Sequence, residues 1–191
     1  DILKIKVGGA FRDDISRVRA ARRGAPRARL ILDGNQGLSP RGALRLLEAV
    51  RKEGAHVDLL EQPVSKDDPK GMAFVARRAG VPVAADESVA NGAQAARALQ
   101  AGAATAVNIK LAKSGLSRSL EIAAVCRAAG VPLMIGCMAE TSRGLAASVH
   151  FALGTGFFRF VDLDSDVLLD EPAGARSAGG WLRRGATVLL A

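Results

Sequence analysis

The run RLILDGNQG, residues 29–37, is the most informative stretch of this chain of 191 residues for its fold. Its apolar segment from Leu30 to Leu32 has the short, continuous pattern of a strand that is covered on both faces, and it ends abruptly at Asp33. A carboxylate is rarely buried unless another group compensates its charge. The same pattern recurs along the chain at intervals of about 25 residues.

Short strand-like runs alternate with alanine-rich helical segments. Several helices end at a glycine that is followed by a new strand, as in RRAGVPVAAD (77–86) and RAAGVPLMIG (127–136). A repeating strand–helix unit with apolar strands predicts a parallel sheet that is covered by helices. The predicted strands are 2–7, 29–33, 57–61, 82–86, 105–110, 132–137 and 158–162. The predicted helices are 14–23, 40–53, 69–79, 92–100, 117–129 and 142–153.

Seven strands and six intervening helices are one unit short of an eightfold α/β barrel, and this count favours a barrel over a doubly wound sheet. We therefore expect an α/β, TIM-like barrel whose missing unit would precede Asp1. The tail, residues 168–191, contains the apolar run TVLLA but does not resemble a further unit, and its structure is left open. No linker-like segment divides residues 1–191.

Composition restricts the classes of function. The hydrophobic content of 49% is ordinary for a soluble globular protein, and no run approaches the roughly 18 apolar residues of a membrane-spanning helix, so we expect no membrane partner. The net charge of +8 could indicate nucleic-acid binding, but the arginines are scattered and only 4% of residues are aromatic, so no nucleic acid is expected either. Cys126 and Cys137 indicate no disulfide framework and a reducing, cytoplasmic location.

Ionisable side chains follow the successive strand ends. Asp33, Glu61 and Asp86 end neighbouring predicted strands and would repel one another unless a cation lay among them. Because all three are oxygen ligands, the predicted ion is Mg²⁺, with Mn²⁺ as the alternative, rather than zinc. Lys6 and Lys110 end the strands on either side of this trio. In a parallel barrel such strand ends converge on one face, where active sites of this architecture lie.

The two lysines indicate the chemistry. In a closed barrel Lys6 and Lys110 would face one another across the metal, and an ammonium near other positive charges has a lowered pKa and can act as a base. Two opposed bases beside a metal-bound oxyanion are what removal of a proton α to a carboxylate, with return from the other face, requires. Each residue alone could be a helix cap, a turn or a surface ion pair. Their recurrence in five consecutive units favours a site.

These residues lie in motifs that resemble a known family. LKIKVGG (3–9), LDGNQG (32–37), LLEQPV (59–64), VAADES (83–88), VNIKLAKSG (107–115) and GCMAETSRG (136–144) resemble the barrel domain of the enolase superfamily, muconate-lactonizing subgroup. VDLDSD (161–166) is similar to the Asp-x-Asp signature of the dipeptide epimerases, the group typified by L-Ala-D/L-Glu epimerase. The resemblance implies a modified (β/α)7β barrel. We therefore expect residues 1–191 to be a partial C-terminal barrel domain that lacks the first strand and the N-terminal capping domain of a longer polypeptide, and to be inactive alone.

The resemblance also implies roles for individual residues. Lys6 and Lys110 match the two acid/base catalysts, and Lys4 matches the lysine that helps the metal neutralise the substrate's enolate oxygen. Asp162 and Asp164 match the pair that holds the α-ammonium of a dipeptide. Asp33, Glu61 and Asp86 match the Mg²⁺ ligands, and Asn35, Gln62 and Glu87 fall at positions that orient them.

The predicted function is therefore a Mg²⁺-dependent isomerase that epimerises dipeptides by 1,1-proton transfer through an enolate, in an enzyme that assembles as a homo-oligomer like its relatives. N-acylamino acid racemisation, o-succinylbenzoate synthesis and muconate cycloisomerisation stay open as alternatives. Asp162 and Asp164 disfavour these reactions, because a muconate or an N-acyl group offers no ammonium. A non-catalytic barrel is a further alternative, and it predicts a degraded lysine pair, whereas Lys6 and Lys110 are both present. Side-chain specificity would depend on the capping domain.

Overall fold

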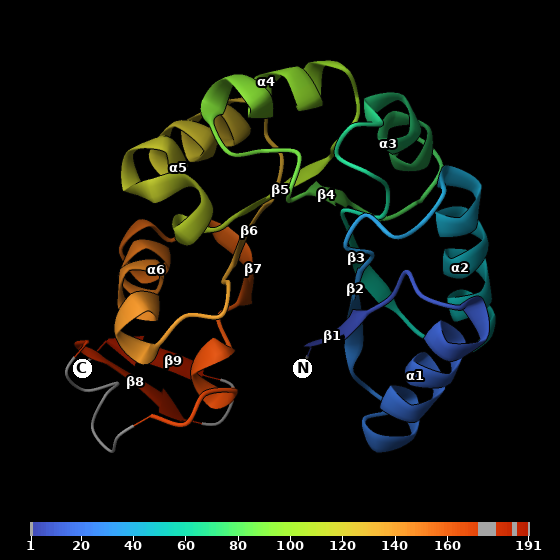
Figure 1. The fold of residues 1–191 in the computed structure, drawn as a ribbon, viewed down its shortest axis with the longest axis horizontal. Coiled ribbons are helices and arrows are strands. Elements are labelled where there is room, and N and C mark those ends of the chain that lie inside the picture. Colours follow the sequence, from blue (N-terminus) through green and yellow to red (C-terminus); the bar gives the residue numbers. More distant parts are fainter. Residues whose placement is uncertain (1, 172–178, 185–186, 191) are drawn as a thin grey trace. The chain divides into compact units, whose positions relative to one another are not determined.

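The computed structural model describes residues 2–171, 179–184 and 187–190 (Figure 1). The chain forms two compact units, Asp1–Val89 with Ala93–Val107, and Ala90–Gly92 with Asn108–Ala191. None of the helices in the described ranges combines the length and the apolar character that a membrane crossing requires.

The first unit is a parallel sheet in which strand order follows the chain. The carboxyl ends of its first three strands are in register, because Lys6 pairs with Asp33 and Asp33 pairs with Glu61. Paired residues of neighbouring strands project to the same side, so this register gathers the side chains at one edge. The elements that lie wholly or partly in this unit are β1 (Ile2–Lys6), α1 (Phe11–Gly24), β2 (Arg29–Asp33), α2 (Pro40–Lys52), β3 (Val57–Glu61), α3 (Pro69–Ala76), β4 (Val83–Ala85), α4 (Gly92–Gln100) and β5 (Ala106–Ile109).

Local sequence explains where two helices of this unit, α2 and α3, begin. Ser39 precedes Pro40 at the start of α2, and its Oγ accepts a hydrogen bond from Gly42 N at 3.1 Å. Asp68 plays the same part for α3, where its Oδ1 accepts from Gly71 N at 2.8 Å. Each helix therefore starts at a side-chain cap followed by a proline that needs no hydrogen-bond partner.

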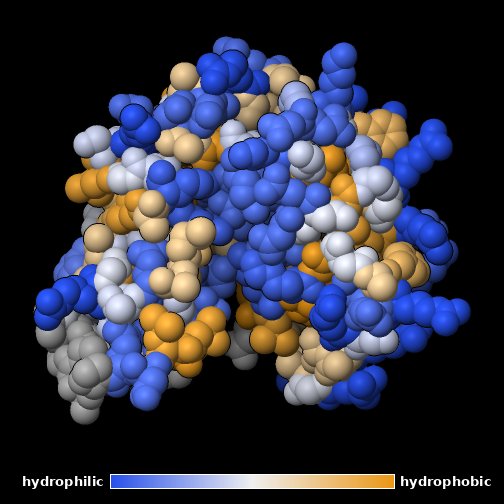
Figure 2. Space-filling view, viewed as in Figure 1, coloured by the Kyte–Doolittle hydropathy of each residue, from blue (hydrophilic) through white to orange (hydrophobic). Residues whose placement is uncertain are grey.

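The core of the first unit lies between the strands and the helices that follow them. Leu30 and Leu32 on β2 and Leu46 and Val50 on α2 are at most 1% exposed, and all four belong to one hydrophobic cluster. Hydrophilic side chains project outward over α1 and α2 (Figure 2). Apolar burial thus fixes the helices against the sheet and leaves the strand ends to carry the charged groups.

The second unit contains the parallel pair β6–β7, in which Gly136 pairs with Asp162. The tail that the sequence left open forms an antiparallel hairpin of β8 (Trp181–Arg184) and β9 (Thr187–Leu190), and Trp181 is completely buried. The remaining elements of this unit are α5 (Leu111–Ala128), β6 (Leu133–Gly136), α6 (Ser142–Thr155), β7 (Phe158–Asp162) and the 3₁₀ helix η1 (Ser165–Val167).

All seven predicted strands and six predicted helices are present in the described residues. The strand β4 is shorter than predicted, so Asp86 lies one residue beyond its end. Helix α1 begins at Phe11 rather than at residue 14, and α3 ends at Ala76 rather than at residue 79. Helix α5 begins at Leu111 rather than at residue 117, because a helical turn directly after the strand joins the main helix across a kink at Gly115 (φ 70°). The other ends agree to within two residues.

The loops after β2 and β3 pack backbone against backbone. A Cβ atom on Gly34 would lie 2.6 Å from Pro63 Cα and 3.1 Å from Gln62 O. Gly34 N also donates to Glu61 O at 2.9 Å, which ties the loop after β2 to the end of β3. Only a glycine permits this approach directly after Asp33, because the neighbouring atoms are main-chain atoms that cannot rotate away.

We therefore expect Gly34→Ala to lower the free energy of unfolding by about 1–3 kcal/mol, because the added methyl group overlaps fixed backbone. Urea denaturation of the full-length protein measures the change. Gly154→Ala is the matched control, since no atom lies within 4 Å of its added Cβ and the position is in α6. The control should be neutral or stabilising, because alanine favours a helix over glycine by about 1 kcal/mol. Equal stabilities of the two variants would contradict the close approach.

Candidate active site

Five ionisable side chains gather at the carboxyl ends of β1 to β4. Lys4 Nζ lies 3.1 Å from Asp33 Oδ2 and 2.8 Å from Glu61 Oε2. Lys6 Nζ donates to the same Asp33 Oδ2 at 2.6 Å. Asp33 and Glu61 are completely buried, and Asp86 is 1% exposed. The structure thus brings together the site residues that the sequence predicted in this unit.

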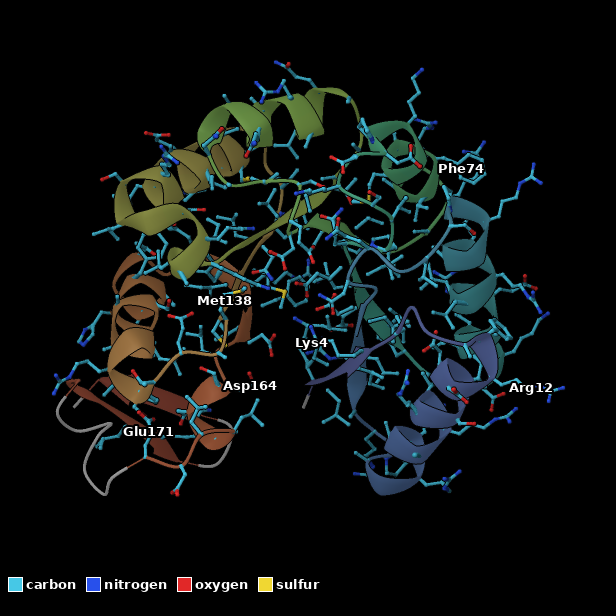
Figure 3. The ribbon with its side chains drawn as sticks, in the orientation of Figure 1. Lys4, Arg12, Phe74, Met138, Asp164 and Glu171 are labelled. Atoms are coloured by element: carbon cyan, nitrogen blue, oxygen red, sulfur yellow. The ribbon has the colours of Figure 1, made fainter. Side chains whose placement is uncertain are left out.

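Lys4 lies on the side of β1 that faces away from α1, whereas Arg12 extends from α1 into solvent (Figure 3). The side chain of Lys4 is 13% exposed and that of Lys6 is 63% exposed. One ammonium is therefore enclosed among the carboxylates, and the other reaches them from a more open position.

The electrostatics of Glu61 tie the three carboxylates together. Burial raises the pKa of Glu61 to about 7, the charge of Lys4 opposes this rise, and the negative charges of Asp33 and Asp86 add to it. Because each of these groups acts on Glu61, the carboxylates share one electrostatic environment. The lysine ammonium groups supply the positive charge that this environment requires.

Asp33, Glu61 and Asp86 have the chemistry that a hard divalent cation requires, because carboxylate oxygens are ligands that Mg²⁺ prefers. Within the described residues, however, no three His, Cys, Asp or Glu side chains are arranged as a complete metal site. Asp33 Oδ2 and Glu61 Oε2 both lie against Lys4, and Asp33 Oδ2 also lies against Lys6. A cation that bound these two oxygens would take the place of the lysine ammonium groups.

Gln62 holds the loop that carries Asp86. Its buried Oε1 accepts hydrogen bonds from Asp86 N at 2.9 Å and from Ser88 Oγ at 3.0 Å, and its Nε2 donates to Val64 O at 2.9 Å. The residue has a φ of 28°, in the left-handed region that non-glycine residues rarely adopt. Bonds from both ends of the amide fix its orientation, and with it the backbone at Asp86.

Asn35 makes contacts with a predicted ligand and with a second predicted orienting residue. Its backbone N donates to Asp33 Oδ1 at 3.0 Å, and its Nδ2 donates to Glu87 Oε1 at 3.4 Å. Asn35 has a φ of 38° and Gln36 a φ of 67°, so the chain turns sharply after β2. This turn leaves one oxygen of Asp33 on the backbone and the other on the lysines.

Asp14 and Arg17 on α1 support Lys6 and were missed by the sequence analysis. Asp14 is 1% exposed, and its Oδ2 accepts from Gly8 N at 3.0 Å. Arg17 Nη1 donates to Asp14 Oδ1 at 2.7 Å and to Lys6 O at 3.4 Å. The pair therefore holds the backbone on the carboxyl side of Lys6. An aspartate in the first turn of a helix is common for reasons of the helix dipole, so the sequence offered no signal for this role.

The remaining predicted residues lie in the second unit. Lys110 is 7% exposed, and its Cε would be 3.1 Å from a Cβ on Gly136, so the absence of a side chain there leaves room for the lysine. Asp162 ends β7 and Asp164 follows it; Cys137 Sγ donates to Asp162 O at 3.4 Å and to Asp164 Oδ1 at 3.7 Å. A position of Lys110 opposite Lys6 stays a prediction.

Known proteins are similar to this chain along most of its length. The family model described as Enolase C-terminal domain-like matches residues 1–179. The L-Ala-D/L-Glu epimerase of Thermotoga maritima is 42% identical over 170 residues, which cover 89% of this chain and 49% of that protein. The chain spans about half the length of the curated relatives it matches.

Solved structures share the fold. The structure of a substrate-liganded complex of the L-Ala-D/L-Glu epimerase from Bacillus subtilis has a TM-score of 0.91 and 35% identity, and the match covers 100% of this chain and 53% of that one. The dipeptide epimerase from Enterococcus faecalis, complexed with Mg and the dipeptide L-Leu-L-Tyr, has a TM-score of 0.81 and 36% identity, over 86% of this chain and 47% of that one. These findings confirm the predicted α/β, TIM-like barrel fold. The chain belongs to the enolase C-terminal domain-like family.

Proposed function

We propose that the protein to which this chain belongs is a Mg²⁺-dependent dipeptide epimerase, an isomerase that inverts the carbon α to a carboxylate. The observation that carries this proposal is the register of β1, β2 and β3, which sets Lys4 and Lys6 against the buried Asp33 and Glu61. The similarity to proteins named L-Ala-D/L-Glu epimerase and dipeptide epimerase supports the choice of substrate.

The proposed metal ligands are Asp33, Glu61 and Asp86. Their burial, their mutual effect on the pKa of Glu61 and the Mg in the complex of the Enterococcus faecalis enzyme support this assignment. Mn²⁺ is the alternative, because it accepts the same oxygen donors. When bound, the ion supplies Lewis-acid polarisation of the substrate carboxylate, which makes the α-proton more acidic.

Three lysines, two from the first unit and one from the second, and two acids of the second unit complete the proposed chemistry. Lys6 and Lys110 exchange the α-proton on the two faces of the substrate, one as base and the other as acid. Lys4 keeps a positive charge beside the substrate carboxylate, where negative charge develops as the proton leaves. Asp162 and Asp164 hold the α-ammonium of the dipeptide through charge-assisted hydrogen bonds.

The proposal extends to the whole protein. Residues 1–191 form the C-terminal barrel domain of a longer enzyme in which a capping domain covers the site and selects the side chains. The enzyme is a homo-oligomer in the cytoplasm, and the free thiols of Cys126 and Cys137 support the reducing location.

Proton exchange tests the proposed function directly. The full-length protein is incubated with Mg²⁺ and mixed L,L-dipeptides in D₂O, and mass spectrometry should detect a gain of one dalton in the accepted dipeptides. Lys110→Ala should lower the exchange rate at least about 100-fold, because it removes one of the two proton-transfer groups. Lys52→Ala is the matched control, since Lys52 is an exposed lysine at the end of α2, where it pairs with Glu48 of the same helix.

Equal rates in the Lys110→Ala and Lys52→Ala variants would contradict the role of Lys110. No exchange with any dipeptide, in a protein that binds Mg²⁺, would contradict the epimerase itself. The next substrates would then be N-acylamino acids, the precursor of o-succinylbenzoate, and muconate.

Gln62→Leu should weaken Mg²⁺ binding by about 10- to 100-fold, because the loop that carries Asp86 loses the amide that orients it. Isothermal titration of the full-length protein measures the affinity. Gln100→Leu at the exposed end of α4 is the control and should leave the affinity unchanged. Unchanged affinity in a Gln62→Leu variant with a wild-type urea midpoint would show that Asp86 is oriented by other groups.

A further inference from the structure

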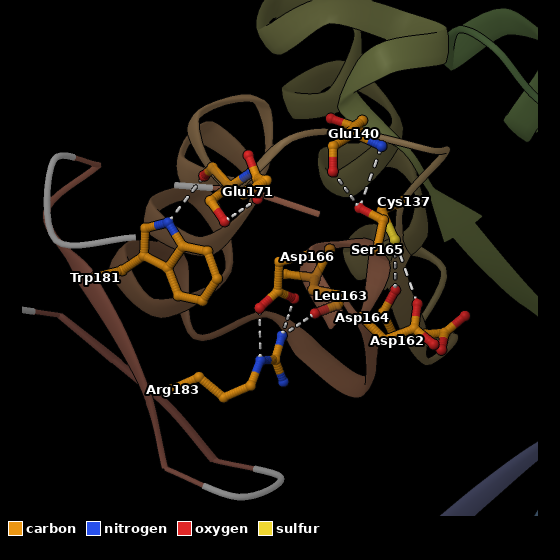
Figure 4. Close-up of polar contacts among 11 residues, drawn as sticks. Cys137, Glu140, Asp162, Leu163, Asp164, Ser165, Asp166, Glu171, Trp181 and Arg183 are labelled. Atoms are coloured by element: carbon orange, nitrogen blue, oxygen red, sulfur yellow. Dashed lines mark hydrogen bonds and ion pairs between the residues drawn. The ribbon is translucent and has the colours of Figure 1, made fainter. Parts of the chain in front are cut away.

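The hairpin that follows the barrel elements carries a buried ion pair to the loop after β7. Arg183 Nε donates to Asp166 Oδ2 at 3.0 Å and Arg183 Nη2 donates to Asp166 Oδ1 at 2.7 Å, a bidentate pair (Figure 4). Asp166 is 1% exposed and the Arg183 side chain 15%. Arg183 Nη2 also donates to Leu163 O. One guanidinium therefore binds two points of the loop that begins at Asp162.

Those two points bracket Asp164. Leu163 is the residue between the two acids of the Asp-x-Asp motif, and Asp166 lies two residues after the second acid, in η1. A guanidinium that binds the Leu163 carbonyl and the Asp166 carboxylate fixes the direction of the chain on both sides of Asp164. Its planar fork permits little rotation, so the constraint on the loop is directional as well as electrostatic.

The loop is held from the opposite side by the segment after β6. Glu140 N donates to Ser165 Oγ at 3.2 Å, and Ser165 Oγ lies 2.7 Å from Glu140 O as a donor to it. The Cys137 thiol contacts Asp162 O and Asp164 Oδ1 (Figure 4). The acid-bearing loop is thus fixed between this segment and β8.

The strand that carries Arg183 is itself anchored by a buried residue. Trp181 is completely buried, and its Nε1 donates to Ser142 O at 3.0 Å at the start of α6. Glu171 accepts from Ser142 N at 2.8 and 2.9 Å, which ties the chain before the hairpin to the same point. Trp181 and Arg183 are alternate residues of one strand and therefore project to the same face (Figure 4).

We infer that Arg183 is a positioning residue for substrate recognition: by binding Leu163 O and Asp166 it holds Asp162 and Asp164 in the orientation that accepts the α-ammonium of the substrate. This inference rests on the proposed function, which assigns the ammonium to those two acids. Stability alone is a weak explanation, because a buried ion pair often contributes no more than apolar residues of similar size would. Its place around the acid pair gives it a specific use.

The test compares a dipeptide with its desamino analogue, which keeps the carboxylate and side chains but has no ammonium. In the full-length enzyme with Mg²⁺, KM and kcat are measured for the dipeptide, and the inhibition constant for the analogue. The main variant is R183M/D166L, which removes both charges and leaves no unpaired buried carboxylate. Arg183→Lys keeps the charge without the fork. Arg159→Met, an exposed arginine of β7, is the matched control.

We expect R183M/D166L to raise KM for the dipeptide about 10-fold or more, with kcat and the inhibition constant of the analogue within about twofold of wild type. Arg183→Lys should lie between this variant and wild type, and Arg159→Met should match wild type. In variants with wild-type near-UV circular dichroism, an unchanged ratio of KM to the inhibition constant would overturn the inference. An equal rise of both constants is one such result, and it would indicate a general loss of order in the substrate site. A wild-type enzyme that exchanges no dipeptide proton would instead overturn the proposed function, and with it the assignment of the acids.

Discussion

The structure of the site depends on burying three carboxylates at the ends of neighbouring parallel strands. Asp33, Glu61 and Asp86 are withdrawn from water, and a carboxylate in that position is tolerated only beside a compensating positive charge. Lys4 and Lys6 supply the charge, and the register of β1 with β2 brings them to Asp33. Under the proposed function, the same ammonium groups would lie near the substrate carboxylate, where negative charge develops as the proton leaves.

The rest of the first unit keeps these groups in place. The amide of Gln62 fixes the loop of Asp86, the turn at Asn35 directs one oxygen of Asp33 to the backbone, and Asp14 with Arg17 holds the chain beyond Lys6. Gly34 permits two of these loops to touch. In the second unit the hairpin plays a similar part for the acid-bearing loop. Charged side chains at strand ends therefore rely on polar contacts from the loops and the helix that follow them, while the apolar core fixes the strands and helices against one another.

Much of the fold and of the candidate site was predictable from the sequence, for a physical reason. Strands that end in a charged residue at nearly equal intervals indicate a parallel sheet and the edge at which the charges meet. The structure has Lys6, Asp33 and Glu61 in register at that edge. Contacts without a periodic pattern were not predictable. Arg183 and Asp166 are 17 residues apart, and nothing in the tail signals their pairing. The kink at Gly115 likewise escaped, because a glycine after a helical turn predicts an end rather than a continuation.

A crystal structure of the full-length protein with Mg²⁺ would show whether the carboxylates at the ends of β2, β3 and β4 hold the cation whose charge the lysines now supply. The proposed assignment predicts Mg²⁺ bound to Asp33, Glu61 and Asp86 at about 2.0–2.1 Å, with the ammonium groups of Lys4 and Lys6 displaced from their present contacts. Mg²⁺ bound elsewhere, with both lysines still against Asp33, would contradict it.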